Sequence, residues 1–278
     1  PFCDQYEQVL DNASFNQNMV DVDLVELSGN VGSYRGEITM AENLPNRDKL
    51  SLKIGGGKRN VYHRQTRLVT SEEGKKKLQE KINAIITPSQ RGLYDKNMSH
   101  AFTIGHENGH SLGPKNNMEA LGQYKAIIEE NKADMISMSM LDLLVDEGLY
   151  TKEERDKIIV SSFIDRLLKA KPELNQPHKA RLVMQQNYFL KNGAITVSPD
   201  GFITFDTDKM VKVSRKMLEE IIKIQMSGDF KAAQKYVEDN FIWNDDIELL
   251  AQKLKSLSNS LNGTVISPLA DKLYTSEI

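Results

Sequence analysis

The sequence predicts a mainly α-helical protein with a small β portion near its N-terminus and a β-hairpin at 194–206. From residue 71 onward, most segments carry apolar side chains every three or four positions, which is the period of an amphipathic helix. Before residue 71, and again at 194–206, apolar and polar residues alternate as they do in half-buried strands. With 278 residues, the chain can bury a sizeable core in one or two domains.

The N-terminal part, residues 1–70, is predicted to be a mixed β and loop segment. Residues 20–27 alternate as a strand does, and 33–40 form a second candidate strand. The next residues, 41–46, contain two asparagines and a proline, which favour an irregular, turn-rich segment. Residues 71–278 are predicted to form a helical domain.

Local signals mark the ends of the helices. Thr151 and Glu154 form a capping box in front of one helix, and Pro177 is well placed in the first turn of another. The predicted helices are 71–86, a helix from an N-cap at Asn97 or Ser99 to Gly113-Pro114, 117–147, 152–169, one from Pro177 to Asn192-Gly193, 208–226, 230–240 and 244–258.

The sequence His106-Glu107-Asn108-Gly109-His110 is an HExxH motif. Residues four apart stand on one face of a helix, so His106 and His110 can direct two imidazole nitrogens at one point. Glu107 is close enough to reach a water held there, which is the arrangement of a zinc hydrolase. The alternative is a solvated helix face that happens to carry two histidines. Apolar neighbours on the same helix argue against it, because buried imidazoles need partners.

Two histidines leave a catalytic zinc site one protein ligand short. The helix predicted at 117–147 carries Glu129, Glu130 and Asp134 within an otherwise apolar stretch. Three carboxylates this close repel one another unless a cation lies among them. Taken alone, they are better explained as an exposed acidic face paired with Lys132. The HExxH motif upstream reverses that balance in favour of a metal site.

The two motifs, HENGH and EENKAD, together resemble the signature of the dipeptidyl peptidase III family of zinc metallopeptidases. The resemblance implies a zincin-like lobe in which zinc is held by His106, His110 and Glu130. Glu107 would be the catalytic carboxylate. Most of that family has one more residue between the two histidines, so the five-residue motif indicates a divergent branch and leaves the substrate preference open.

The resemblance also assigns residues around the metal. Glu129 and Asp134 would accept hydrogen bonds from the ligand imidazoles and orient them. Asn43 and Asn46 match an Asn-(Leu/Ile)-Pro-Asn segment that holds the amino end of a bound peptide in the family. His178, shortly before an Ala-Arg pair, would stabilise the developing oxyanion. From the residues alone, Asn43 and Asn46 lie in a loop, and His178 is a solvent-facing histidine at a helix start.

Composition and charge limit the classes of partner that we expect for this chain. A net charge of -3 and a pI near 6.0 argue against a nucleic-acid binder, and no apolar run is long enough to span a membrane. The one cysteine, Cys3, suits a reducing compartment, so we expect a cytoplasmic protein. The chain begins with Pro1, and members of the family it resembles are much longer. We therefore expect a missing N-terminal lobe that forms the other wall of the cleft.

The predicted function is zinc-dependent peptide hydrolysis, in which zinc-bound water attacks the carbonyl with Glu107 as general base. The resemblance implies release of dipeptides from the N-terminus of short peptides. One alternative is a zinc hydrolase of non-peptide or altered substrate on the same scaffold, which the shortened motif motivates. The other is a non-catalytic peptide-binding protein that retains the metal. A structural zinc site usually has four protein ligands, and only three are found here.

Overall fold

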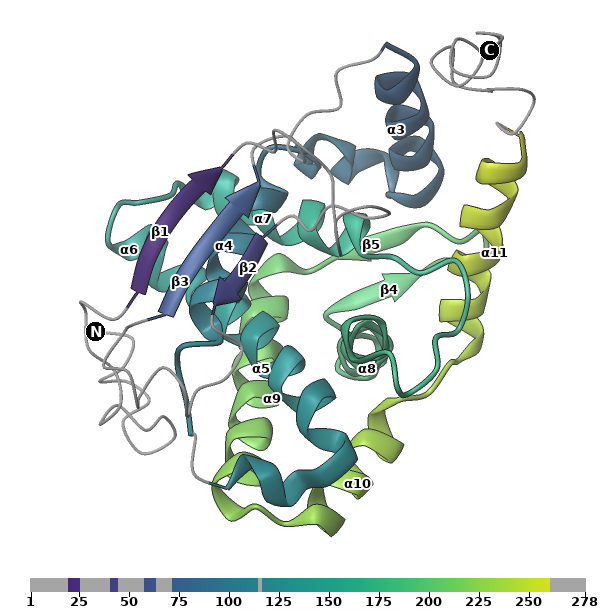
Figure 1. The fold of residues 1–278 in the computed structure, drawn as a ribbon. Coiled ribbons are helices and arrows are strands. Elements are labelled where there is room, and N and C mark those ends of the chain that lie inside the picture. The colour runs from purple at the N-terminus through teal and green to yellow at the C-terminus, as the bar shows by residue number, and fades with distance from the viewer. Residues whose placement is uncertain (1–19, 26–40, 45–57, 64–71, 115–116, 261–278) are drawn as a thin grey trace, which may run out of the picture.

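The computed structural model describes residues 20–25, 41–44, 58–63, 72–114 and 117–260, and these form a mainly helical protein with two small sheets (Figure 1). The predicted fold class is confirmed. The second candidate strand, 33–40, lies outside the described residues. Among the residues that are described, no helix is long and apolar enough to cross a membrane.

The helices largely follow the predicted pattern. The capping box of Thr151 and Glu154 is present in front of α7, and Pro177 opens α8. In the described parts of the chain the helices are α3 (Glu72–Ile85), α4 (Ser99–Gly109), α5 (Lys125–Ser139), α6 (Leu141–Asp146), α7 (Lys152–Asp165), α8 (Pro177–Lys191), α9 (Thr207–Ser227), α10 (Phe230–Asn240) and α11 (Asp245–Ser260), with 3₁₀ helices η5 (Pro88–Leu93) and η6 (Met118–Tyr124).

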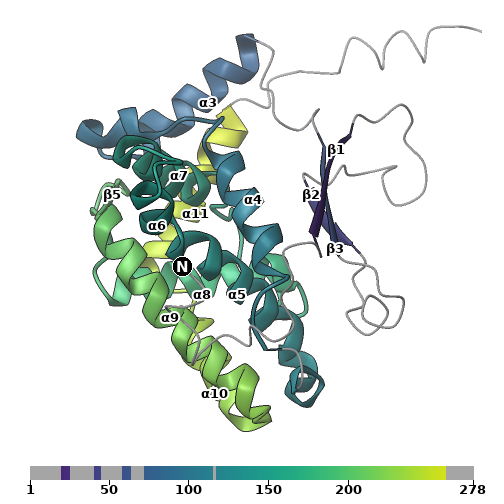
Figure 2. The ribbon, with the colours of Figure 1, turned by 90° about the vertical axis from the view of Figure 1, so that its left-hand side faces the viewer.

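The N-terminal strands form a three-stranded sheet in the order β1 (Val20–Val25), β3 (Lys58–His63) and β2 (Ala41–Leu44). β1 pairs with β3 in parallel, and β2 pairs with β3 in antiparallel register. The prediction of an irregular segment at 41–46 is therefore wrong for the first four residues. They form a strand because pairing with a distant strand overrides their turn propensity. The sheet stands beside the helical body, with β2 next to α4 (Figure 2).

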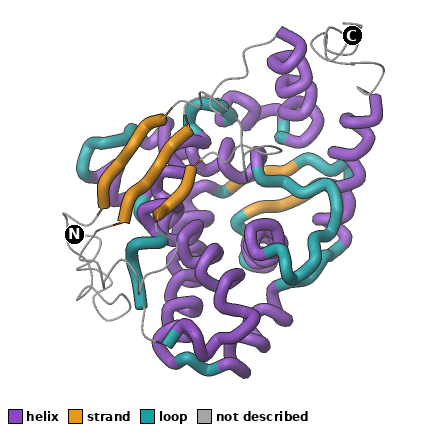
Figure 3. The backbone as a smooth tube through the Cα atoms, in the orientation of Figure 1, coloured by secondary structure: helices purple, strands orange, loops and turns teal. Residues whose placement is uncertain are grey.

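The hairpin predicted at 194–206 is confirmed as β4 (Ile195–Val197) and β5 (Ile203–Phe205), which pair antiparallel. Gly201 in its turn has φ 72°, a left-handed value that glycine adopts without strain. The two short strands lie inside the helical part, apart from the three-stranded sheet (Figure 3). A bridge between Ile86 and Ile203 ties the hairpin to the end of α3.

Helix α5 is the centre of the packing. Every residue from Asn131 to Ser139 is buried, and α4, α8 and α9 all pack against this helix. A helix buried on all sides gains most of its stability from tertiary contacts rather than from propensity. Polar groups on α5 consequently have to find partners inside the protein.

The prediction of a single helix at 117–147 is wrong, because the segment is divided into η6, α5 and α6. The first break is at Gly122, whose φ of 55° and ψ of -128° lie outside the helical region. A side chain there would also crowd Phe230, since an added Cβ would lie 3.1 Å from its Cε2 atom. Gly122 therefore sets the direction in which α5 enters the core.

The helix that carries the HExxH motif also differs from its prediction at both ends. The N-cap position is occupied by Met98, and Ser99 Oγ instead donates a hydrogen bond to the Lys96 carbonyl at 2.9 Å. The helix ends at Gly109, with His110 as its C-cap, rather than at Gly113-Pro114. Gly113, with φ 95°, lies in the turn that follows.

Replacing Gly122 with alanine should lower the free energy of unfolding by about 1–3 kcal/mol, because alanine strongly disfavours this backbone conformation. The measurement is a urea titration of the variant against the parent. Gly92→Ala is the control, since an added Cβ at Gly92 meets no atom within 4 Å. Equal stability of the two variants would contradict the role given to Gly122.

Candidate metal centre

The close approach of α4 and α5 brings the two motifs together. Gly105 and Gly109 lie four residues apart on the face of α4 that packs on α5. An added Cβ on Gly109 would lie 2.8 Å from the carbonyl oxygen of Ala133, and one on Gly105 would overlap Ser137 Oγ. Ser137 Oγ also donates a hydrogen bond to the Phe102 carbonyl at 2.8 Å. The glycines thus let the two backbones pack at a distance that no larger residue permits.

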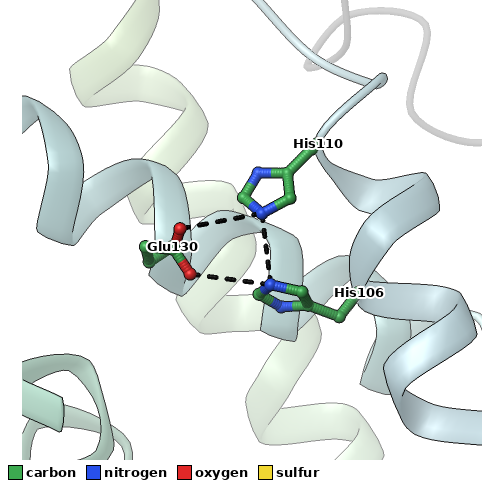
Figure 4. A group of neighbouring side chains, drawn as sticks. All are labelled: His106, His110 and Glu130. Carbon is green, nitrogen blue, oxygen red and sulfur yellow. Dashed lines mark hydrogen bonds and ion pairs between the residues drawn. The ribbon is translucent and has the colours of Figure 1, made fainter. Parts of the chain in front are cut away.

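Three side chains converge at this contact (Figure 4). The Nε2 atoms of His106 and His110 are 3.1 Å apart. The Glu130 carboxylate lies across from them, with Oε2 at 3.5 Å from His106 Nε2 and Oε1 at 3.7 Å from His110 Nε2. One ligand atom from each residue can be chosen such that all lie within 4.8 Å of one another.

This geometry fits a shared metal ion. Zinc bonds of 2.0–2.2 Å in a tetrahedral arrangement place neighbouring ligand atoms about 3.3 Å apart. Each histidine also has a carboxylate next to its Nδ1 atom, which favours the tautomer with the proton on Nδ1. The two Nε2 atoms then face each other and Glu130 with lone pairs, and a cation between them removes the repulsion.

Two carboxylates from α5 hold the imidazoles from behind. His106 Nδ1 lies 2.8 Å from Asp134 Oδ1, and His110 Nδ1 lies 3.3 Å from Glu129 Oε1. These are the two residues expected to orient the histidines, and the structure places both in contact with the predicted partners. The contacts fix the ring planes, so the separation of the Nε2 atoms depends on α5 as much as on α4.

Asp134 is the most heavily bonded of these groups. Its Oδ2 atom accepts hydrogen bonds from Arg181 Nε at 2.6 Å, from Arg166 Nη1 at 2.7 Å and from Gln185 Nε2 at 2.8 Å. Burial alone would raise the pKa of Asp134, but Arg166 and Arg181 outweigh it and hold the pKa well below its usual range. Asp134 is thus a permanent anion that accepts from His106.

Glu130 is also kept ionised by its surroundings. Burial would raise its pKa, but a hydrogen bond with His178 and the charge of Arg181 lower it below the usual value. Arg181 Nη1 lies 2.9 Å from Glu130 Oε2, and His178 Nδ1 lies 3.1 Å from the same oxygen. An ionised carboxylate is the form that binds a metal.

Glu107 has the opposite environment. It is 7% exposed, and burial raises the pKa of its carboxyl, which the neighbouring His106 and His110 offset only in part. No hydrogen bond to this carboxylate is found among the described residues. A carboxylate with a raised pKa beside two imidazoles can accept a proton and return it.

The remaining predicted site residues are placed less fully. His178 contacts Glu130 from the first turn of α8, and its side chain is 74% exposed. Asn43 lies in β2, next to α4, and only its backbone is described. Asn46 lies outside the described residues. The structure therefore brings His178 to Glu130, one of the three candidate ligands, and brings the strand of Asn43 to the helix that carries the other two.

Sequence reasoning missed Arg166, Gln185 and Gln225, which hold the carboxylates of Asp134 and Glu129. They come from α8, α9 and the residue after α7, and no local motif marks them. The signal that could have found them is the burial of the acidic motif itself. Buried carboxylates require nearby donors, and polar residues on the apolar faces of neighbouring helices are the candidates.

Replacing Gly109 with alanine should push α4 away from α5 and lower the free energy of unfolding by about 1–3 kcal/mol, because the new methyl group meets backbone atoms that cannot turn aside. The measurement is urea unfolding of the metal-free protein, with Gly92→Ala as the unhindered control. A Gly109 variant as stable as the control would show that the helices do not pack this closely.

Three comparisons place the chain among known proteins. No protein-family model matches it. "Nudix hydrolase 3" of Arabidopsis thaliana is 25% identical over 265 residues, which are 90% of this chain and 33% of that protein. The chain thus spans about a third of that relative.

Two solved structures match most of the chain and share its fold. Dipeptidyl peptidase III from Caldithrix abyssi superposes with a TM-score of 0.73 at 22% identity, over 91% of this chain and 51% of that one. Dipeptidyl-peptidase III from Corallococcus sp. strain EGB superposes with a TM-score of 0.70 at 23% identity, over 81% of this chain and 42% of that one. The resemblance of the motifs is thereby confirmed at the level of the fold: this chain has the fold of about half of a dipeptidyl peptidase III molecule.

Proposed function

We propose that the chain is the zinc-bearing part of a dipeptidyl peptidase III, which releases dipeptides from the N-terminus of short peptides. The observation that carries this proposal is the convergence of His106 Nε2, His110 Nε2 and the Glu130 carboxylate beside buried Glu107. The same constellation is expected from the motifs, and the chain has the matching fold.

The donor set favours zinc. Two imidazole nitrogens and one carboxylate oxygen are the protein ligands of many catalytic zinc sites, in which a fourth position stays open to water or substrate. His106, His110 and Glu130 would hold the ion. When bound, zinc supplies a Lewis acid that lowers the pKa of water and polarises a carbonyl oxygen.

Glu107 performs the proton transfers in this proposal. Its carboxylate accepts a proton from the water that attacks the peptide carbonyl, and it then donates that proton to the nitrogen of the leaving amine. Burial supports both steps, because a raised pKa makes the Glu107 carboxylate a stronger base than an exposed glutamate and lets its acid form persist to higher pH.

His178 is proposed as the group that steadies the oxyanion. The hydrogen bond with Glu130 raises the pKa of His178, although burial opposes the shift. A raised pKa increases the imidazolium fraction at neutral pH, and an imidazolium can donate to a developing negative charge. The large exposed part of the ring leaves room for a substrate beside it.

Substrate binding is proposed to involve residues 1–70. Asn43 and Asn46 would hold the amino end of the peptide, and the position of β2 next to α4 supports this for Asn43. Residues 71–278 would form the catalytic domain. A further lobe would supply the other wall of the cleft, since the chain covers about half of the matched structures. We propose a cytoplasmic setting, in keeping with the single cysteine.

The second candidate function is a zinc hydrolase of non-peptide or altered substrate on this scaffold. The shortened motif favours it, because α4 ends at Gly109 and leaves His110 at the end of the helix. Turnover of dipeptidyl arylamides distinguishes the two candidates. A protein that binds zinc, contains Glu107 and cleaves none of these substrates fits the second.

Replacing Glu107 with glutamine should lower kcat on a dipeptidyl arylamide by about 10²–10⁴-fold, because the amide cannot accept the proton. Zinc content, measured by atomic absorption, should stay near that of the parent, since Glu107 is not among the three converging residues. Glu153→Gln is the exposed control and should keep full activity. Unchanged turnover in the Glu107 variant would rule out its role as base.

Replacing Glu130 with alanine should reduce bound zinc from about one equivalent to a small fraction, because two imidazoles alone bind the ion weakly. The measurement is metal content after dialysis against a weak chelator. Glu119→Ala provides a comparison, since Glu119 is exposed and pairs with Lys125. Full retention of zinc in the Glu130 variant would exclude this carboxylate as a ligand.

A further inference from the structure

Lys132 is a fully buried cation beside the candidate metal centre. Its side chain is 0% exposed, and Lys132 is the largest of the fully buried residues in the described part of the chain. Its Nζ atom lies 2.8 Å from Glu129 Oε1 and donates a hydrogen bond to the carbonyl oxygen of Leu112. An ammonium group leaves water at a high desolvation cost, so its few partners matter energetically.

The two partners of Lys132 lie on either side of His110. Glu129 is the carboxylate next to His110 Nδ1, at 3.3 Å. Leu112 follows His110 by two residues, in the turn after α4. One ammonium group thus contacts both the group that orients the imidazole and the backbone that carries it.

His110 needs such support more than His106 does. His106 lies inside α4, where backbone hydrogen bonds on both sides fix its position. His110 is the C-cap of α4, at the end where carbonyl groups lack helical partners and the backbone frays. A positive charge close to the C-terminus of a helix is favourable, because it interacts with those carbonyl groups.

The turn after α4 is shaped to admit Lys132. Gly113 has φ 95°, and an added Cβ there would lie 3.2 Å from Lys132 Cδ and 3.5 Å from its Nζ atom. The absence of a side chain at Gly113 therefore lets the turn close over the lysine. This is a second observation, independent of the ion pair, that ties Lys132 to the end of the HExxH helix.

We propose that Lys132 is a positioning residue for the metal centre, which holds Glu129 and the turn after α4 and so fixes His110 as a ligand. The inference rests on the proposed zinc site and adds a residue to it. On the His106 side, Arg166 and Arg181 do the same for Asp134. Each histidine is thus held by a carboxylate, and each carboxylate by at least one buried or partly buried cation.

The test is the affinity of the metal-free protein for zinc, measured by competition with a chromophoric chelator. Lys132→Met keeps the length of the side chain and removes the charge and the donors. It should weaken zinc binding by about 10–100-fold, the usual effect of losing a group that orients a ligand. Lys132→Arg, which retains charge and donors, should recover most of the affinity.

A second measurement separates positioning from stability. The visible spectrum of the cobalt-substituted protein reports the geometry of the ligands, and it should change in Lys132→Met. Lys81→Met is the control, because Lys81 is a partly buried lysine that donates to the Ile164 carbonyl at 2.7 Å and not to a residue of the metal centre. Whatever stability the Lys81 variant loses, it should keep the parental zinc affinity and cobalt spectrum.

The outcomes are distinct. A Lys132→Met protein with parental zinc affinity and cobalt spectrum overturns the inference and leaves the zinc site intact. A parent protein that binds no zinc overturns the proposed function together with the inference. If Lys132→Met does not fold, Gln225→Met replaces it, since Gln225 Nε2 donates to Glu129 Oε2 at 3.0 Å. Parental affinity in that variant would show that anchoring Glu129 does not control the metal.

Discussion

The contact between α4 and α5 at Gly105 and Gly109 is the constraint on which the rest of the site depends. Helices normally pack 8–10 Å apart, and glycines at the contact allow the closer end of that range. The HExxH motif supplies two imidazoles from one helix, and the acidic motif supplies the carboxylates of Glu129, Glu130 and Asp134 from the other. A wider spacing would leave each motif intact and separate the side chains that must meet.

Burial then determines the role of each carboxylate. Arg166 and Arg181 outweigh burial at Asp134, and His178 and Arg181 outweigh it at Glu130, so both pKa values are low. At Glu107 burial outweighs the neighbouring positive groups, and the pKa is raised. The neighbours of each carboxyl group thus decide its role. Asp134 and Glu130 stay ionised, whereas Glu107 can take up and release a proton. The two arginines come from α8 and from the residue after α7, so the chemistry of the site depends on how these helices pack against α5.

Local signals were sufficient for the helices that carry their own caps, such as α7 with Thr151 and Glu154, and for the metal motifs, whose spacing is set by one helix. Contacts between residues far apart in the sequence could not be predicted from these local signals. Strand β2 pairs with β3, which is distant in sequence, and Gly122, whose backbone divides a predicted helix, lies against Phe230. The donors to Asp134 and Glu129 could not be assigned for the same reason: their helices are far apart in sequence and meet only in the fold.

The end of α4 at Gly109 has a consequence for how this site tolerates changes in length. Deleting one residue from a helix rotates everything beyond it by about 100° about the axis. In α5 such a deletion would turn the carboxylates of Glu129, Glu130 and Asp134 away from the two histidines that they contact. Beyond His110 the helix has ended, so a gain or loss of one residue there is taken up by the turn that follows and leaves both imidazoles on the same helix face. The chain can therefore vary in length just after the histidine motif but not within the acidic motif.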